Sequence, residues 1–144
     1  AYNNLALIFA RENQPEQALK FIERALDFDP VNPIYLNNKG YVLLLQNQQS
    51  EAKKLIDQSL TKDPQNSYAH RNLGLYFLKN GQKPEALTAF QKSYQLSPDT
   101  DQIHLWLGEA LFVNNQREAA CRIWTKGEAL GEADAVVKYK QNCK

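Results

Sequence analysis

The residues in this chain best suited to chemistry are two cysteines, Cys121 and Cys143, and two histidines, His70 and His104. Thiolate and imidazole groups act as nucleophiles, general bases and metal ligands when they converge. The histidines occupy equivalent positions of an internal repeat, where a large packing residue is expected, and no carboxylate or cysteine stands at a fitting neighbouring position. The sequence also lacks a Ser/His/Asp arrangement and a glycine-rich phosphate loop. We therefore expect packing histidines, no metal or other cofactor, and no enzyme activity.

The two cysteines stand on either side of a turn at Gly131, about ten and twelve residues away from it. If the flanking segments form an antiparallel helix hairpin, Cys121 and Cys143 lie nearly opposite each other. A disulfide between them would add about 3 kcal/mol in the chain-entropy model and would favour an oxidising compartment such as the periplasm. The alternative is a pair of half-buried thiols in a cytosolic protein, so the compartment stays open.

A fixed interval of 34 residues organises the elements that must position these side chains, as the prolines at Pro30, Pro64 and Pro98 show. Alanines recur at the same interval, at Ala18, Ala52, Ala86 and Ala120. A period of this length with small, aromatic and proline landmarks is typical of arrays in which each unit is a helix, a tight turn and a second helix. The sequence therefore predicts an all-α repeat protein.

These landmarks resemble the tetratricopeptide repeat (TPR) family, whose pattern is a large residue, then Leu-Gly, an aromatic, Ala, an aromatic, Ala and Pro. The third repeat matches at His70, Leu73, Gly74, Phe77, Ala86, Phe90, Ser93 and Pro98. The other repeats match in the same register, although Lys39 replaces a leucine and the fourth repeat has no closing proline. The resemblance implies a right-handed α–α superhelix in a single domain over 1–144, with repeats at about 1–30, 31–64, 65–98 and 99–131. Residues from about 132 to 143 are expected to form a capping helix.

Helix boundaries follow from the prolines and from polar turns. The second helix of each repeat should end before the closing proline, because the residue before proline disfavours helical backbone. Asn32 followed by Pro33 should cap the next helix, and Asn66 and Thr100 stand in the same place of later repeats. Asparagine and glycine in the turns between paired helices are expected to adopt left-handed backbone.

The resemblance also implies that the first helices of successive repeats line a concave groove. Asn4, Asn38 and Asn72 occupy equivalent groove positions, with Asn3 and Asn37 beside two of them. An asparagine amide donates to a peptide carbonyl and accepts from a peptide N–H, so this column is predicted to bind an extended main chain. The alternative is a set of solvated groove residues without a ligand.

Other groove positions are predicted to add apolar and cationic contacts. Tyr41, Tyr68 and Trp106 supply flat apolar surface, of the residue types that dominate interface energetics. Arg71 and Lys79 favour a peptide that carries a carboxylate. Trp106 has a second interpretation, in which it packs the fourth repeat against the cap. The lysine pair of the family's carboxylate clamp for chaperone tails is missing, which disfavours that ligand.

The leading hypothesis for function is a scaffold or adaptor that binds an extended segment of another protein. RNA binding, which related helical-repeat proteins perform, is disfavoured by a formal net charge of +1, from 17 Lys+Arg against 16 Asp+Glu. A third hypothesis is self-association into a homo-oligomer through the first repeat, where Tyr2, Leu5 and Phe9 have no preceding repeat in this sequence. No apolar run approaches the length of a membrane span.

Overall fold

The computed structural model describes residues 1–143, and every regular element in that range is an α-helix. The chain divides into two compact units, Ala1–Asn72 and Leu73–Lys144. The division falls inside helix α5 (Ser67–Lys79), which contributes its first part to one unit and its second part to the other. The single domain expected over residues 1–144 stays a prediction. None of the helices in the described part of the chain is long and apolar enough to cross a membrane.

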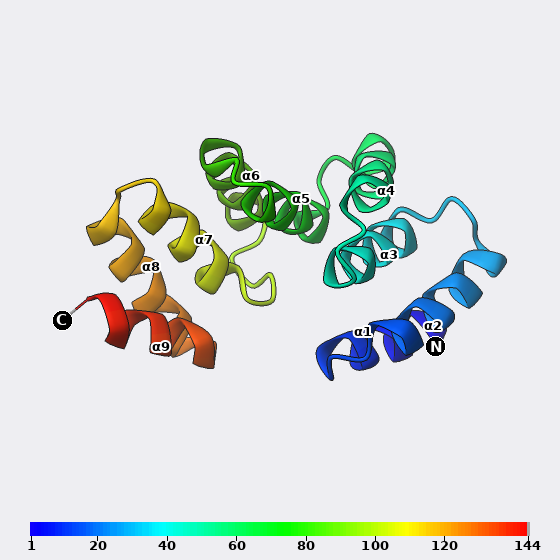
Figure 1. Ribbon diagram of the computed structural model, residues 1–144, viewed down its shortest axis with the longest axis horizontal. Coiled ribbons are helices and arrows are strands. Elements are labelled where there is room, and N and C mark those ends of the chain that lie inside the picture. Colours follow the sequence, from blue (N-terminus) through cyan, green and yellow to red (C-terminus); the bar gives the residue numbers. More distant parts are fainter. Residues whose placement is uncertain (144) are drawn as a thin grey trace. The chain divides into compact units, whose positions relative to one another are not determined.

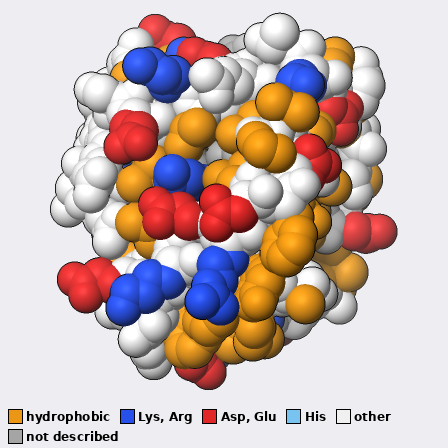
Figure 2. Space-filling model, turned by 90° about the vertical axis from the view of Figure 1, so that its right-hand side faces the viewer, with side chains coloured by type: hydrophobic (Ala, Val, Ile, Leu, Met, Phe, Trp, Pro, Cys, Tyr) orange, Lys and Arg blue, Asp and Glu red, His pale blue; other side chains and the backbone are white. Residues whose placement is uncertain are grey.

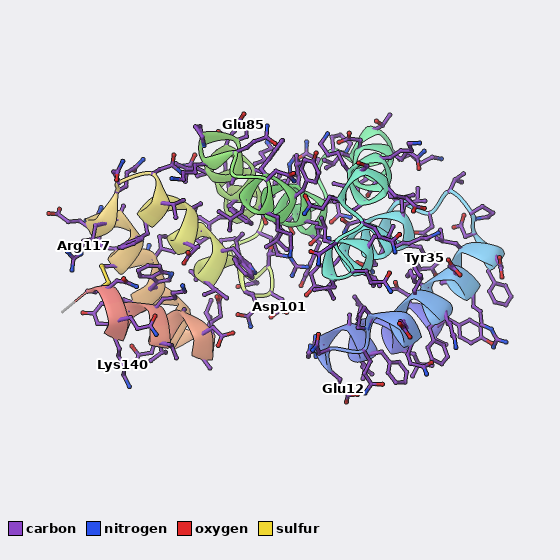
Figure 3. All side chains as sticks on the ribbon, viewed as in Figure 1. Glu12, Tyr35, Glu85, Asp101, Arg117 and Lys140 are labelled. Atoms are coloured by element: carbon purple, nitrogen blue, oxygen red, sulfur yellow. A yellow bond between two sulfur atoms is a disulfide. The ribbon has the colours of Figure 1, made fainter. Side chains whose placement is uncertain are left out.

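The first unit contains two complete helix hairpins and the start of a third (Figure 1). Its helices before α5 are α1 (Tyr2–Arg11), α2 (Pro15–Phe28), α3 (Pro33–Leu45) and α4 (Gln49–Lys62). α1 packs on α2 and α3 packs on α4, while α2 also lies against α3. Tyr35 of α3 packs against the cluster of Ala6, Ile22 and Ala25 that α1 and α2 form (Figure 3). The second hairpin therefore contributes a side chain to the core of the first.

The second unit repeats this arrangement and ends in a single helix. After the last part of α5 it contains α6 (Lys83–Leu96), α7 (Ile103–Val113), α8 (Arg117–Ala129) and α9 (Ala133–Asn142). α6 packs on α7 and α7 packs on α8, while α9 lies against both α8 and α7. α9 therefore occupies the place of the capping helix that was expected at about 132–143.

Left-handed residues close the turn inside each complete hairpin. Asn13, Asn47, Gly81 and Asn115 have φ angles of 60°, 59°, 72° and 66°, and they follow one another at the 34-residue interval. Glycine and asparagine adopt this conformation at lower cost than most residues, so they end the first helix of the hairpin. The predicted turn chemistry is confirmed.

Asparagine caps start α3 and α5 as predicted, but α7 starts differently. Asn32 Oδ1 accepts hydrogen bonds from two backbone N–H groups of α3, and Asn66 Oδ1 does the same for α5. The prediction that Thr100 caps the next helix is wrong, because the N-cap position of α7 is Gln102 and its side chain makes no capping hydrogen bond; the Thr100 hydroxyl donates to the Ser97 carbonyl oxygen at 2.7 Å. α7 begins only at Ile103, after Gln102 with a φ of 61°.

In three of the hairpins a glycine of the first helix lies directly against a large side chain of the second. A Cβ atom added at the glycine would lie 2.8 Å from Ile56 at Gly40, 2.6 Å from Phe90 at Gly74 and 2.2 Å from Trp124 at Gly108. Real Cβ atoms do not come this close to other heavy atoms. The small residue of the repeat pattern is therefore required by packing.

Candidate functional site

Asparagine side chains join the first helices of neighbouring repeats in the first unit. Asn38 on α3 donates a hydrogen bond from Nδ2 to Asn3 Oδ1 on α1 at 2.8 Å. Asn72 on α5 donates in the same way to Asn37 Oδ1 on α3, also at 2.8 Å. Both bonds span 35 residues, one more than the repeat interval of 34. Each asparagine therefore bonds the residue just before its own equivalent in the preceding repeat. We call Asn3, Asn38, Asn37 and Asn72 the asparagine ladder.

The ladder leaves little amide surface open to a partner. Asn37, Asn38 and Asn72 are 1%, 8% and 0% exposed, respectively. Asn4, which stands at the equivalent position of the first repeat, is exposed. Buried amides are satisfied by partners inside the protein, and here the partners are other asparagines. Peptide binding by Asn4, Asn37, Asn38 and Asn72 stays a prediction, and three of these side chains already hold the helices together.

Arg71 lies between two aromatic rings beside the ladder. Its guanidinium carbon is 5.2 Å from the centroid of the Tyr41 ring and 5.0 Å from that of the Tyr68 ring. Its Nε and Nη2 donate to Asn72 Oδ1 at 3.2 and 3.0 Å, so the amide that donates to Asn37 also accepts from Arg71. Arg71 is 8% exposed, and cation–π contacts are stronger where water is excluded. The ladder thus fixes a cation between two tyrosines.

The two tyrosines provide the accessible part of this arrangement. Tyr68 is 42% exposed, and Tyr41 is half-buried. Each ring offers a flat apolar face with a hydroxyl at its edge, and the guanidinium between them makes the local potential positive. We call Tyr41, Tyr68 and Arg71 the tyrosine–arginine surface. Its chemistry suits an apolar contact combined with a carboxylate or carbonyl oxygen.

The remaining predicted binding residues, Lys79 and Trp106, belong to the second unit. Lys79 is exposed in the last turn of α5. Trp106 is half-buried and lines a pocket together with residues of α9. Both interpretations given for Trp106 from the sequence are therefore compatible with its position. The residues predicted as one site are divided between the two units.

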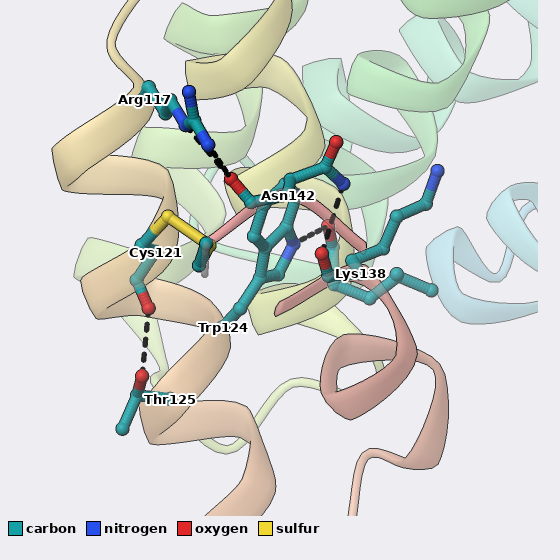
Figure 4. Close-up of a disulfide and its surroundings, with 8 residues drawn as sticks. Arg117, Cys121, Trp124, Thr125, Lys138 and Asn142 are labelled. Carbon is teal, nitrogen blue, oxygen red and sulfur yellow. Dashed lines mark hydrogen bonds between the residues drawn. A yellow bond between two sulfur atoms is a disulfide. The ribbon is translucent and has the colours of Figure 1, made fainter. Parts of the chain in front are cut away.

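Cys121 and Cys143 form a disulfide that joins α8 to the residue after α9 (Figure 4). Their Cα atoms are 5.8 Å apart. The sequence allowed either a disulfide or two free thiols at Cys121 and Cys143, and the structure contains the disulfide. Arg117 Nε donates to the carbonyl oxygen of Asn142 at 2.8 Å, so a second contact ties the same end of α9 to α8. The assignment to the periplasm stays a prediction.

The two histidines have different surroundings. His70 is half-buried, and its Nε2 is 2.8 Å from the Pro64 carbonyl oxygen. His104 is 2% exposed, and its Nδ1 is 2.6 Å from Glu132 Oε2. The expectation that no carboxylate stands near a histidine is wrong, because Glu132 reaches His104 from the turn before α9. Within residues 1–143, no cluster of three or more His, Cys, Asp or Glu side chains is placed to hold a metal ion.

Glu132 is the structurally important residue that the sequence analysis missed. It is 6% exposed, and its Oε1 accepts a hydrogen bond from the Leu105 N–H at 2.9 Å while Oε2 contacts His104. Glu132 stands one repeat interval after Pro98, where a closing proline would have been expected. A glutamate in place of this proline was the feature of the sequence that could have pointed to a special role. Its carboxylate fastens the start of α9 to the first turn of α7.

The face of α1 that the self-association hypothesis invokes is only partly open. Leu5 and Ile8 are 39% and 47% exposed. Tyr2 and Phe9 are half-buried and turn towards α2, where both stack on Phe21 with ring centroids 6.2 and 5.3 Å apart. Figure 2, which views the molecule from the side of α1 and α2, shows hydrophobic side chains gathered in a band among charged ones. Self-association through the first repeat stays a prediction.

Removal of one ladder amide is expected to destabilise the protein. Asn72→Ala should lower the free energy of unfolding by about 1–3 kcal/mol, because Asn37 and Arg71 each lose a buried hydrogen-bond partner. Urea unfolding followed by circular dichroism measures the change. Asn4→Ala is the matched control, since this exposed side chain stands at the equivalent repeat position, and its effect should stay within about 0.5 kcal/mol. Equal effects of the two variants would refute the ladder as a stabilising feature.

A family model described as tetratricopeptide repeat matches residues 3–67, 37–100 and 71–124. No curated protein matches the chain. The matched ranges overlap and together cover most of the chain. They also include the whole of the asparagine ladder.

Solved structures share the fold at low sequence identity. MamA 41-end from Desulfovibrio magneticus RS-1 is 22% identical, with a TM-score of 0.68 over 92% of this chain and 75% of that one. TTC0263, a TPR protein of Thermus thermophilus, is 18% identical, with a TM-score of 0.79 over 91% of this chain and 73% of that one. The Sgt2 TPR domain from Aspergillus fumigatus is 20% identical, with a TM-score of 0.67 over 82% of this chain and 80% of that one.

These likenesses concern the fold, and they confirm the predicted class, an all-α superhelical solenoid of TPR repeats. Helix hairpins that recur every 34 residues, left-handed turns at the same interval and a family model that matches in three overlapping copies all agree. The chain belongs to the tetratricopeptide repeat family.

Proposed function

We propose that this protein is an interaction module, a scaffold or adaptor that binds an extended segment of another protein at the tyrosine–arginine surface. The observation that carries the proposal is the guanidinium of Arg71, placed between Tyr41 and Tyr68 and fixed by Asn72. Tyrosine and arginine are enriched among the residues that supply most of the binding energy at interfaces. Because these side chains are already ordered, binding loses less side-chain entropy than it would at a mobile surface.

The expected ligand is a peptide segment that carries a carboxylate. Arg71 supplies the positive charge, and Tyr68 supplies exposed apolar area beside it. Asn4 is exposed and can bond a peptide main chain, whereas Asn37, Asn38 and Asn72 act by holding α1, α3 and α5 in place. The protein thus recognises its partner through a prepared surface rather than through a column of free amides.

RNA is the second class of partner that this chemistry could suit, since aromatic rings and arginine stack on unpaired bases. A formal net charge of +1 provides no field that would attract a polyanion. The charge balance therefore favours a protein partner.

Sedimentation velocity at several concentrations would separate binding to a foreign segment from self-association.

Tyr68→Ala is expected to weaken binding of an acidic extended peptide by about 1–3 kcal/mol, because an exposed anchor ring beside the cation is lost. The measurement is fluorescence anisotropy of labelled synthetic peptides that contain Asp or Glu, with the Asn/Gln versions as neutral counterparts. Phe28→Ala is the control, since Phe28 is an aromatic residue of the same unit that is 80% exposed and lies outside this surface.

The proposal predicts that acidic peptides bind, that neutral ones bind more weakly, and that only Tyr68→Ala reduces the affinity. Equal losses in the Tyr68 and Phe28 variants, or equal binding of acidic and neutral peptides, would contradict it. Tight, strongly salt-dependent binding of single-stranded RNA would replace it with the RNA alternative.

A further inference from the structure

A pocket of about 420 Å³ lies in the second unit, between α7 and α9. Leu105, Trp106 and Val137 give it an apolar lining, and Glu109, Asp134 and Lys138 stand among its polar lining residues. Val137 is 49% exposed, so an apolar side chain of α9 remains accessible here. Pockets with mostly apolar walls and a few placed polar groups are the usual form of a binding site.

The wall that α9 contributes is fixed at both of its ends. At the start of α9, Glu132 bonds to His104 and to the Leu105 N–H. At its end, the disulfide of Cys121 and Cys143 joins the chain to α8. The pocket therefore exists before a ligand arrives, and a partner would lose little affinity to rearrangement of the protein.

The charges of the lining leave an excess of carboxylate. Lys138 Nζ is 3.1 Å from Glu109 Oε2, an ion pair that crosses from α9 to α7 and neutralises both groups. Asp134 is exposed, and no ion pair joins it to any residue between 1 and 143. With two carboxylates against one ammonium, the pocket favours a cation near Asp134.

We propose that this pocket takes a large apolar side chain from a segment of a partner protein in which the adjacent residue is lysine or arginine. The apolar side chain packs against Trp106 and Val137, and the basic residue pairs with Asp134. The inference rests on the proposed function in treating the protein as an interaction module, and it adds a second surface. The charge preference of this surface is opposite to that of the tyrosine–arginine surface.

Short synthetic peptides in a neutral Gly/Ser background test the inference, with Phe-Arg, Phe-Glu or Ser-Arg at the centre. Affinity is measured from NMR titrations that follow the Trp106 indole and the α9 amides. We expect the Phe-Arg peptide to shift these signals and to bind more than about tenfold more tightly than Ser-Arg, which lacks the apolar side chain. It should bind about fivefold more tightly than Phe-Glu, whose carboxylate faces Asp134.

Asp134→Lys should reverse the preference between Phe-Arg and Phe-Glu, because it reverses the charge at an exposed position. Glu128→Lys is the matched control, since Glu128 is an exposed carboxylate of the same unit outside the pocket, and it should leave the preference unchanged. No binding of Phe-Arg at millimolar peptide, shifts confined to residues outside the pocket, or an unchanged preference in Asp134→Lys would overturn the inference.

Each of the two proposals can be refuted without affecting the other. Tyr68→Ala should leave Phe-Arg binding in the second unit unaltered, and Asp134→Lys should leave binding of acidic peptides to the first unit unaltered. Loss of Phe-Arg binding in the Tyr68 variant would overturn the pocket as an independent site. Failure of the acidic peptides alone would overturn the proposed function and leave the pocket in place.

Discussion

Glu132→Ala should lower the free energy of unfolding by about 3–5 kcal/mol, because two buried groups lose their carboxylate acceptor and each unsatisfied buried partner costs about 1–3 kcal/mol or more. His104 and the Leu105 N–H would both lose their acceptor inside the protein, because His104 is 2% exposed and Glu132 is 6% exposed. Urea unfolding followed by tryptophan fluorescence measures the loss. Both tryptophans, Trp106 and Trp124, belong to the second unit, so the signal reports the unit in which Glu132 lies.

Two variants separate the buried contact from a general effect of charge. Glu132→Gln keeps an acceptor for the Leu105 N–H and should therefore cost less than Glu132→Ala. Glu128→Ala removes an exposed carboxylate from α8 and should change the unfolding free energy by no more than about 0.5 kcal/mol. A loss below about 1 kcal/mol in Glu132→Ala would mean that packing, the disulfide and the Arg117 hydrogen bond hold the cap without Glu132.

The repeat interval allowed most of the fold to be predicted because it constrains local structure and packing together. Asn13 and Asn47 are left-handed where the turn requires it, and Gly74 stands where Phe90 leaves no space for a side chain. These features depend on backbone conformation and residue size, which a repeated pattern reveals directly. Most helix ends, the hairpin pairing and the cap could be placed in this way, whereas the start of α7 could not.

Side-chain partners were harder to predict, because a repeat pattern gives the position of a residue along its helix and not the neighbour that it meets. Asn38 and Asn72 were correctly grouped as equivalent, yet each bonds an asparagine one repeat earlier instead of standing free. The 35-residue spacing of Asn3 and Asn38 was visible, but its meaning depends on how closely the first helices approach. Glu132 was missed because it lies where the pattern ends.

Trp124→Ala should cost about 3–5 kcal/mol, as is typical of truncating a buried tryptophan. Trp124 is 0% exposed, its indole Nε1 donates to the Leu105 carbonyl oxygen at 3.2 Å, and its ring centroid is 5.8 Å from that of Phe112. The side chain also fills the space that Gly108 leaves open. Urea unfolding followed by far-ultraviolet circular dichroism is the suitable measurement, because this substitution removes a fluorophore.

The other repeats suggest a compensating change, because the two residues that meet at this contact differ in size from one repeat to the next. The first repeat places buried Ala6 on α1 and buried Ile22 on α2 at the positions that Gly108 and Trp124 occupy in the fourth. Gly108→Ala alone should destabilise the protein by about 1–3 kcal/mol, because its new Cβ would overlap the indole.

Combining Gly108→Ala with Trp124→Ile should recover part of that loss, since the smaller isoleucine leaves room for the Cβ. A double-mutant cycle with Trp124→Ile as the second single variant should therefore give a favourable coupling of about 1 kcal/mol or more. Strictly additive effects would show that α7 and α8 separate to admit the methyl group. In that case the close approach at Gly108 would not be what determines the size of residue 124 in this repeat.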